Sequence, residues 1–140
     1  MKFLSTSLLL ISLMCTPAVA DYTPGITSEP CGNGTGKILI ANNGKPYCRN
    51  NRNFNWWSAM SWCQSIGMEL ISINEDCICA GEKCPSAVCP NFAVSNWGFT
   101  WTSNVDKNNR TIMITGNGGA ASDGSFGNPA GYGLAVCRMP

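Results

Sequence analysis

The clearest periodic pattern of apolar residues lies between positions 54 and 66. Apolar side chains recur there at steps of three and four residues and therefore share one face of a helix. They are Trp56, Ala59, Cys63 and Ile66. Asn53 or Asn55 can cap the first turn by accepting backbone N–H bonds, and Gly67 stands where a left-handed residue ends a helix. The pattern predicts one helix over residues 54–66.

A short apolar run before the helix predicts a β-hairpin. Residues 37–41 are followed by Asn42-Asn43-Gly44, whose Asn-Gly pair favours a type I′ turn, and residues 45–48 form the return arm. The preceding segment, 21–35, is rich in Pro, Gly, Thr and Asn and is expected to be an N-terminal loop.

Several short segments after the helix are expected to be extended. They are residues 68–73, 97–103, 111–115 and 132–138. A polar turn is expected at 104–110, and a long surface loop at 116–131, which contains six glycines. One helix among several short strands, without an internal repeat, predicts an α+β fold.

The first twenty residues have the pattern of a secretory signal peptide. Lys2 precedes an apolar stretch that is short for a transmembrane helix, and Ala18-Val19-Ala20 provides small residues for cleavage. We expect cleavage after Ala20, with an uncleaved anchor as the alternative. No later apolar run is long enough to span a bilayer. The mature chain is therefore expected to be secreted, periplasmic or associated with the cell surface.

The chain contains nine cysteines, and loss of Cys15 with the signal peptide leaves eight. An even number in an exported chain predicts four disulfides. Cys31 and Cys48 lie near the two arms of the predicted hairpin and suit a link between them. Four others fall within residues 77–90, at Cys77, Cys79, Cys84 and Cys89. These four predict two local disulfides, and a zinc ion held by four thiolates is the alternative that export disfavours.

Charge and composition exclude several functional classes. The chain has 9 Lys+Arg and 8 Asp+Glu. Loss of Lys2 leaves eight of each, so no basic patch for nucleic acid is expected. The absence of histidine excludes Ser-His-Asp and Cys-His catalytic groups and any zinc site that uses histidine. No cofactor and no metal ion are expected.

Glu75 and Asp76 come nearest to a catalytic carboxylate pair. A glycosidase needs two carboxylates that face each other across a cleft, whereas neighbouring carboxylates at the start of a loop are commonly solvated surface groups. The sequence therefore favours a protein that is not an enzyme. A hydrolase that uses Glu75 or Asp76 is the weaker alternative.

The run Trp56-x2-Ala59-x3-Cys63-x3-Gly67-x2-Leu70-x2-Ile73 resembles the first-helix signature of the C-type lectin-like domain, in which a helix is followed by a glycine and a strand. Residues 101–103 and 134–138 are similar to the central and last strands of that family. The resemblance covers residues 36–140. It implies an α+β domain with short mixed antiparallel sheets, one N-terminal helix, long irregular loops and several disulfides.

The resemblance also implies a disulfide pairing. In this family a cysteine of the first helix bonds to one in the last strand, which corresponds to Cys63 and Cys137 here. Such a bond closes a loop of about 74 residues and stabilises the fold by about 4 kcal/mol in chain-entropy models. Cys31 with Cys48 is the second expected pair. The four remaining cysteines then pair among themselves, with Cys77 and Cys79 bonded to different partners.

The calcium ligands of many sugar-binding members do not occur in this chain. Neither Glu-Pro-Asn nor Gln-Pro-Asp stands between Trp101 and Cys137, and the loop 116–131 holds one carboxylate, Asp123. The cysteine cluster also takes the place of the family's second helix after Ile73. The sequence is closest in pattern to the short, calcium-independent form found in bacterial adhesin tips and variable surface lectin-like proteins.

The polar loops are the predicted binding surface, because Asn and Ser side chains both donate and accept hydrogen bonds. The candidate residues are Asn104, Asp106, Asn108, Asn109, Arg110, Asn117, Asp123, Phe126 and Asn128. Phe126 is either an apolar anchor for a ligand or a plug that holds its loop to the core. Ordinary solvated loops are the alternative interpretation. Among the tryptophans, Trp56 and Trp101 are expected in the core and Trp57 nearer the surface.

Together these features predict a secreted, non-enzymatic binding module that recognises an extracellular protein or glycan in adhesion or surface recognition. A structural component of an extracellular appendage is the main alternative. Either role is compatible with an oligomer or a larger surface assembly.

Overall fold

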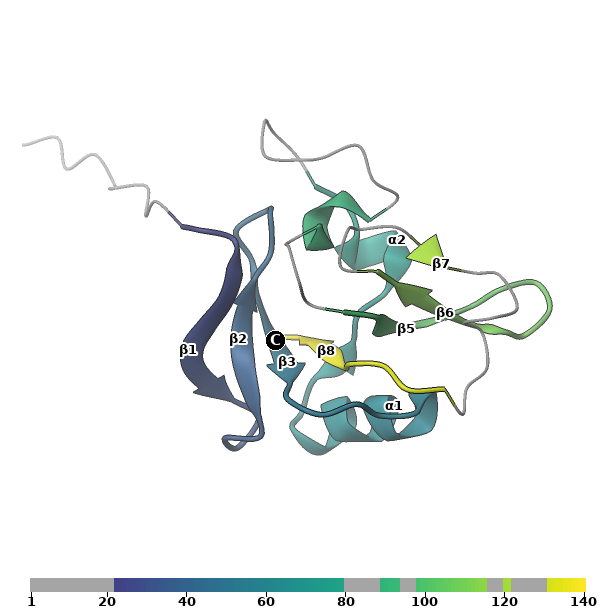
Figure 1. Cartoon of the computed structure of the whole chain (residues 1–140), viewed down its shortest axis with the longest axis horizontal. Helices are drawn as coiled ribbons and strands as arrows, with labels where there is room; N and C mark the ends of the chain where they lie inside the picture. Colours follow the sequence, from purple (N-terminus) through teal and green to yellow (C-terminus); the bar gives the residue numbers. More distant parts are fainter. Residues whose placement is uncertain (1–21, 80–88, 94–97, 116–119, 122–130) are drawn as a thin grey trace, which may run out of the picture.

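The computed structural model describes residues 22–79, 89–93, 98–115, 120–121 and 131–140. These residues form a small α+β fold with two antiparallel sheets and one main helix (Figure 1). The α+β class predicted from the sequence is therefore confirmed. The predicted signal peptide, Cys84 and the predicted ligand residues Asn117, Asp123, Phe126 and Asn128 lie outside the described residues.

The larger sheet has five strands in the order β1-β2-β3-β8-β4, and all its neighbouring strands are antiparallel. The strands are β1 (Gly25–Cys31), β2 (Gly36–Ile40), β3 (Pro46–Asn50), β8 (Val136–Arg138) and β4 (Glu69–Leu70). The predicted last strand thus lies between the hairpin and the segment after the helix. It is shorter than expected, since Gly133 and Leu134 form only isolated bridges, with Phe54 and Thr100.

The expectation of a loop over residues 21–35 is wrong, because Gly25–Cys31 forms the edge strand β1. Most of this strand is exposed, so its side chains show no apolar alternation. Backbone pairing with β2 makes it a strand, and a pattern of side chains does not report such pairing.

The predicted hairpin over residues 37–48 is confirmed, but its turn differs from the predicted type I′. That turn requires a positive φ at both central residues. Gly44 has φ of 81°, whereas Asn43 is not among the residues with positive φ. Two backbone bonds close the turn: Gly44 N donates to Ala41 O over 2.9 Å, and Ala41 N donates to Lys45 O over 3.0 Å.

The smaller sheet joins β5 (Thr100–Val105), β6 (Thr111–Ile114) and β7 (Ala120–Ala121). Figure 1 shows β5 and β6 on the side of the molecule away from β1, with α1 (Trp56–Ser65) along its lower edge. Strands were predicted at 97–103 and 111–115, and the structure confirms both with shifted ends.

The main helix begins and ends close to the predicted residues. Asn55 Oδ1 accepts a hydrogen bond of 2.8 Å from Ser58 N at its start. Gly67 follows its end with φ of 72°, the left-handed conformation that glycine adopts without strain. Ala59 and Cys63 are fully buried on the predicted inward face.

The segment after the helix is less extended than predicted. Only Glu69–Leu70 pairs as a strand, and Ile73–Asp76 forms a single helical turn, α2. Asp76 explains this turn, since its Oδ2 accepts a bond of 2.7 Å from Ser72 N at the start of α2. A short 3₁₀ turn at Pro90–Phe92 packs its Phe92 ring edge-on to Tyr47, with centroids 4.8 Å apart.

The tryptophans lie as predicted from the helical pattern. Trp101 is fully buried, and Trp56 is half-buried with its Nε1 donating to Thr102 O over 2.8 Å. Trp57 is 55% exposed. The core therefore takes one of the two adjacent helical tryptophans and leaves the other on the surface.

Three predicted disulfide relationships are confirmed. Cys31 bonds to Cys48, and Cys63 to Cys137. Cys77 bonds to Cys89, and Cys79 is also disulfide-bonded, so Cys77 and Cys79 have different partners as expected. Because these sulfurs are oxidised, the alternative of a zinc ion held by four thiolates is wrong.

None of the helices in the described part of the chain combines the length and hydrophobicity that crossing a membrane requires. Disulfides at this density are typical of proteins that fold in an oxidising compartment.

The two disulfides that tie the larger sheet together should differ in their contribution to stability. Cys63–Cys137 spans 74 residues and Cys31–Cys48 spans 17. Chain-entropy models assign about 4 kcal/mol to the first and about 3 kcal/mol to the second. Urea unfolding of the Cys63→Ala/Cys137→Ala and Cys31→Ala/Cys48→Ala variants should show the larger loss for the first pair. An equal or larger loss for the second pair would contradict this ranking.

Candidate functional site

The predicted turn at 104–110 is held by its own polar side chains. Asn104 Oδ1 accepts a bond of 2.7 Å from Ile73 N, which links the turn to α2. Asp106 Oδ1 accepts from Asn108 N and Arg110 N, and its Oδ2 lies 2.6 Å from Arg110 Nη2. Hydrogen bonds from the backbone and side chain of Arg110 lower the pKa of Asp106. Three of the five predicted turn residues thus maintain the turn itself.

Asn108 and Asn109 are the members of this predicted set whose side chains are exposed. Asn109 has φ of 59°, a left-handed conformation that Asn tolerates better than most residues. The turn therefore offers two exposed amides to a ligand.

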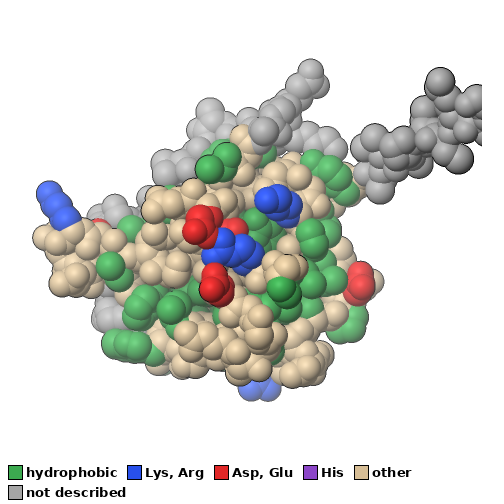
Figure 2. Space-filling model, turned by 180° about the vertical axis from the view of Figure 1, so that it is seen from behind, with side chains coloured by type: hydrophobic (Ala, Val, Ile, Leu, Met, Phe, Trp, Pro, Cys, Tyr) green, Lys and Arg blue, Asp and Glu red, His purple; other side chains and the backbone are tan. Residues whose placement is uncertain are grey.

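Glu75 and Asp76 do not form a pair of facing carboxylates. Arg138 lies between them and Glu69: its Nη1 is bonded to Glu75, its Nη2 is 2.9 Å from Glu69 Oε2, and Asp76 Oδ2 is 3.9 Å from Nη1. Figure 2 shows acidic side chains gathered around a basic one on this face. These carboxylates are ion-pair partners of one guanidinium, so Glu75 and Asp76 are both engaged by Arg138.

Asp76 is nonetheless in an unusual environment. Its side chain is buried against Tyr47, whose hydroxyl donates to Asp76 Oδ1 over 3.3 Å. Burial raises the pKa of Asp76, while the bond from Ser72 N opposes the rise. Burial and the neighbouring Asp76 charge raise the pKa of Tyr47 to about 12. The Asp76 carboxylate and the Tyr47 hydroxyl thus bond to each other, and Asp76 also bonds to the backbone at Ser72.

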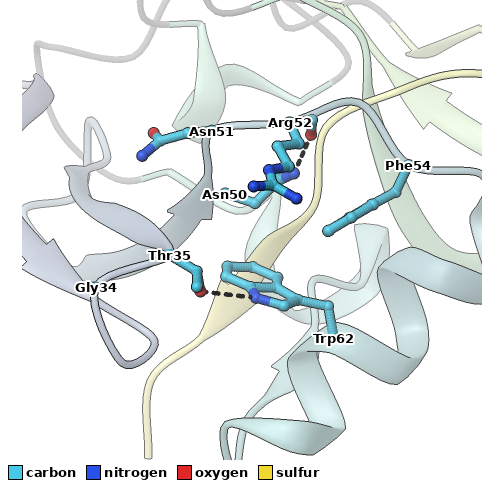
Figure 3. Close-up of a pocket in the computed structure, with 7 residues that line it drawn as sticks. All are labelled: Gly34, Thr35, Asn50, Asn51, Arg52, Phe54 and Trp62. Carbon is cyan, nitrogen blue, oxygen red and sulfur yellow. Dashed lines mark hydrogen bonds between the residues drawn. The ribbon is translucent and has the colours of Figure 1, made fainter.

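A cleft of about 420 Å³ lies between the β1–β2 turn, the segment that joins β3 to α1, and α1 itself (Figure 3). This volume is within the range of small-molecule sites. Its lining residues are Gly34, Thr35, Asn50, Asn51, Arg52, Phe54 and Trp62. We call it the Phe54–Trp62 cleft, after the two aromatic rings that form one side of it.

The two rings are fixed in different ways. Trp62 is half-buried on α1, and its Nε1 donates to Thr35 Oγ1 over 3.1 Å. Phe54 is held by a pair of backbone bonds to Gly133, of 2.7 and 2.9 Å. The ring centroids are 6.1 Å apart with an interplanar angle of 47°. The rings therefore form a tilted apolar wall, in which backbone bonds fix Phe54 and a side-chain bond fixes Trp62.

Glycine allows the β1–β2 turn to approach this wall. A Cβ on Gly32 would lie 3.1 Å from both Trp62 Cζ2 and Ile66 Cδ1, closer than a side chain normally packs. Gly32 also has φ of 56°, which suits glycine. The turn can thus bring Thr35 to Trp62.

Asn50 organises the opposite side of the cleft. It is buried, its Oδ1 accepts from Ala135 N over 2.6 Å, and its Nδ2 donates to Arg52 O. These bonds fix the backbone at residues 51 and 52, whose side chains are exposed. The cleft consequently combines an aromatic wall with an exposed amide and an exposed guanidinium, while the Thr35 hydroxyl accepts from Trp62 Nε1 and donates to Gly32 O.

The sequence pattern does not predict this cleft. Trp62 lies beside the periodic face that Cys63 marks, and Arg52 and Thr35 are polar residues in short connections. A signal was present in the two aromatic residues, Phe54 and Trp62, eight positions apart around the helix start. Their meeting with Thr35 depends on how the hairpin packs on α1, which local patterns do not encode.

Comparisons of this chain with protein-family models, with curated proteins and with solved structures find no match.

Asp76 provides a pH-dependent contribution to stability that can be isolated. Because its pKa is raised in the folded protein, its contribution is fully present below the unfolded pKa, about 3.9, and is lost as pH rises through the folded value. Wild type should therefore gain stability relative to Asp76→Asn when pH is lowered from about 7 to about 4.

Urea unfolding of both proteins at the two pH values measures this change. Glu29→Gln, in the exposed strand β1, is the control for loss of a carboxylate elsewhere. If the difference in unfolding free energy between wild type and the Asp76→Asn variant stays constant or moves in the opposite direction, the assignment is contradicted.

Proposed function

We propose that this protein is a secreted, non-enzymatic binding module of the C-type lectin-like type that binds a hydroxyl-rich glycan, without calcium, in the Phe54–Trp62 cleft. The observation that carries the proposal is the cleft itself, where two aromatic rings stand beside exposed hydrogen-bonding groups. The faces of sugar rings carry C–H groups that pack on aromatic rings, and their hydroxyls bond to amides, hydroxyls and guanidinium groups.

The arrangement of the ends of the domain supports the lectin-like assignment. Strand β8 pairs with β3 on one side and β4 on the other, and Cys137 in β8 is bonded to Cys63 in α1. The smaller sheet and its connections lie in the chain between these tied segments. This arrangement supports the lectin-like assignment, because the resemblance implies a bond between the first helix and the last strand.

The positions and ion pairs of the carboxylates favour binding over catalysis. The pair that a hydrolase would use, Glu75 and Asp76, is engaged by Arg138. None of the described residues that line the Phe54–Trp62 cleft is acidic. These residues can hold a ligand, and none of them could serve as the acid or base of a glycosidase.

Trp62→Ala should weaken glycan binding at least about tenfold, because truncation of an aromatic anchor commonly costs more than about 1.4 kcal/mol. A glycan array would first identify a ligand for the wild-type protein, and titration calorimetry would then compare the variants. Trp57→Ala is the matched control, since Trp57 is an exposed tryptophan of the same helix that does not line the cleft. It should retain wild-type affinity.

Trp62→Phe keeps an aromatic face and loses the bond to Thr35, so it separates stacking from the hydrogen bond. Binding should be unaffected by a chelator. Loss of binding in Asn108→Ala with retention in Trp62→Ala would assign the ligand to the 104–110 turn instead. Absence of binding to any glycan would refute the proposal in favour of a protein ligand or an inert structural component.

A further inference from the structure

We infer that the glycan bound in the Phe54–Trp62 cleft carries an anionic substituent, a carboxylate or a sulfate, that pairs with Arg52. This inference rests on the proposed function and adds to it the chemical class of the ligand. It starts from the composition of the cleft lining, in which Arg52 is the one charged residue among seven.

The backbone carbonyl of Arg52 is fixed by the bond from Asn50 Nδ2. Figure 3 shows the Arg52 side chain extending from this fixed backbone toward Phe54 and Trp62. An anion held by the guanidinium would therefore belong to a ligand that also touches the two rings. Guanidinium groups bind carboxylates and similar oxyanions through two parallel hydrogen bonds, which orients the ligand as well as attracting it.

No carboxylate in the described part of the chain neutralises Arg52. The ion pairs found there join Asp106 to Arg110, and Glu69, Glu75 and Asp76 to Arg138. Glu29, the remaining described carboxylate, lies on the edge strand β1 and does not line the cleft. Arg110 and Arg138 are thus paired with acids, whereas Arg49 and Arg52 have no ion pair in the described part of the chain. Of these two, Arg52 lines the cleft.

All charged residues in the stretch of chain that builds the cleft are basic. Between Glu29 and Glu69 there is no Asp or Glu. The same stretch contains Lys37, Lys45, Arg49 and Arg52. Lys45 lies at the far end of the hairpin near Asp76, so within the cleft the positive charge is that of Arg52, and none of the described lining residues is acidic. A positive potential over a cleft attracts anions and raises their association rate.

The direct test uses oligosaccharides that differ only in charge. The probes are hexagalacturonate, its carboxyl-reduced neutral counterpart, and a sulfated form of that neutral hexasaccharide. Wild type should bind an anionic probe at least about tenfold more tightly than the neutral one, and the preference should shrink as salt is raised. The carboxylated and sulfated probes show which anion the guanidinium prefers.

Three variants locate the preference. Arg52→Gln should remove the preference for the anionic probe, so that its affinities for the anionic and neutral probes agree within about twofold. Arg52→Lys keeps the charge but loses the planar fork, so it should retain only part of the preference. Lys107→Gln, which removes an exposed charge in the 104–110 turn, is the matched control and should behave as wild type.

The outcomes separate this inference from the proposed function. Equal binding of anionic and neutral probes, with loss of both in Trp62→Ala, would overturn the anionic inference and leave the glycan site standing. A preference for anions that persists in Arg52→Gln would also overturn it. Absence of binding to all three probes by wild type, at low and moderate salt, would count against this inference, and absence from the full glycan array would refute the function beneath it.

Discussion

The position of strand β8 is the constraint on which the rest of the structure depends. Cys137 lies opposite Cys48 in β3 and opposite Leu70 in β4, and its sulfur is bonded to Cys63 in α1. One residue therefore joins the hairpin, the segment after the helix and the helix. Because all of these partners are buried, the joint is also the centre of the apolar core between α1 and the sheet.

Much of this frame follows from local sequence patterns. The helix follows from side chains at steps of three and four residues together with Asn55 and Gly67, and the hairpin follows from an apolar run ahead of Asn-Gly. The Cys63–Cys137 bond followed from a family resemblance, because eight cysteines admit too many pairings for spacing alone to decide. The helix and the hairpin share a cause, because each is encoded by residues close in sequence, whereas the Cys63–Cys137 bond joins residues 74 positions apart.

The features that the sequence did not predict depend on backbone pairing and on polar and packing contacts that side-chain periodicity does not report. Strand β1 exists because β2 offers it backbone partners, and the short turn α2 exists because Asp76 reaches back to Ser72 and toward Tyr47. The cleft depends on the packing of the β1–β2 turn against Trp62. The turn at 104–110 differs from the cleft, because it was predicted as a binding surface from its polar side chains. Its side chains looked available for a ligand, but Asn104 and Asp106 are used to hold the backbone.

The bonds between Phe54 and Gly133, and between Asn50 and Ala135, bear on when the cleft forms during folding. Both sides of the cleft are held by residues about eighty positions away along the chain, and contacts across such separations form late in folding. A chain that has formed its helix and hairpin but has not yet docked these distant residues would lack an organised pocket. Ligand capture would then be a property of the fully assembled protein alone.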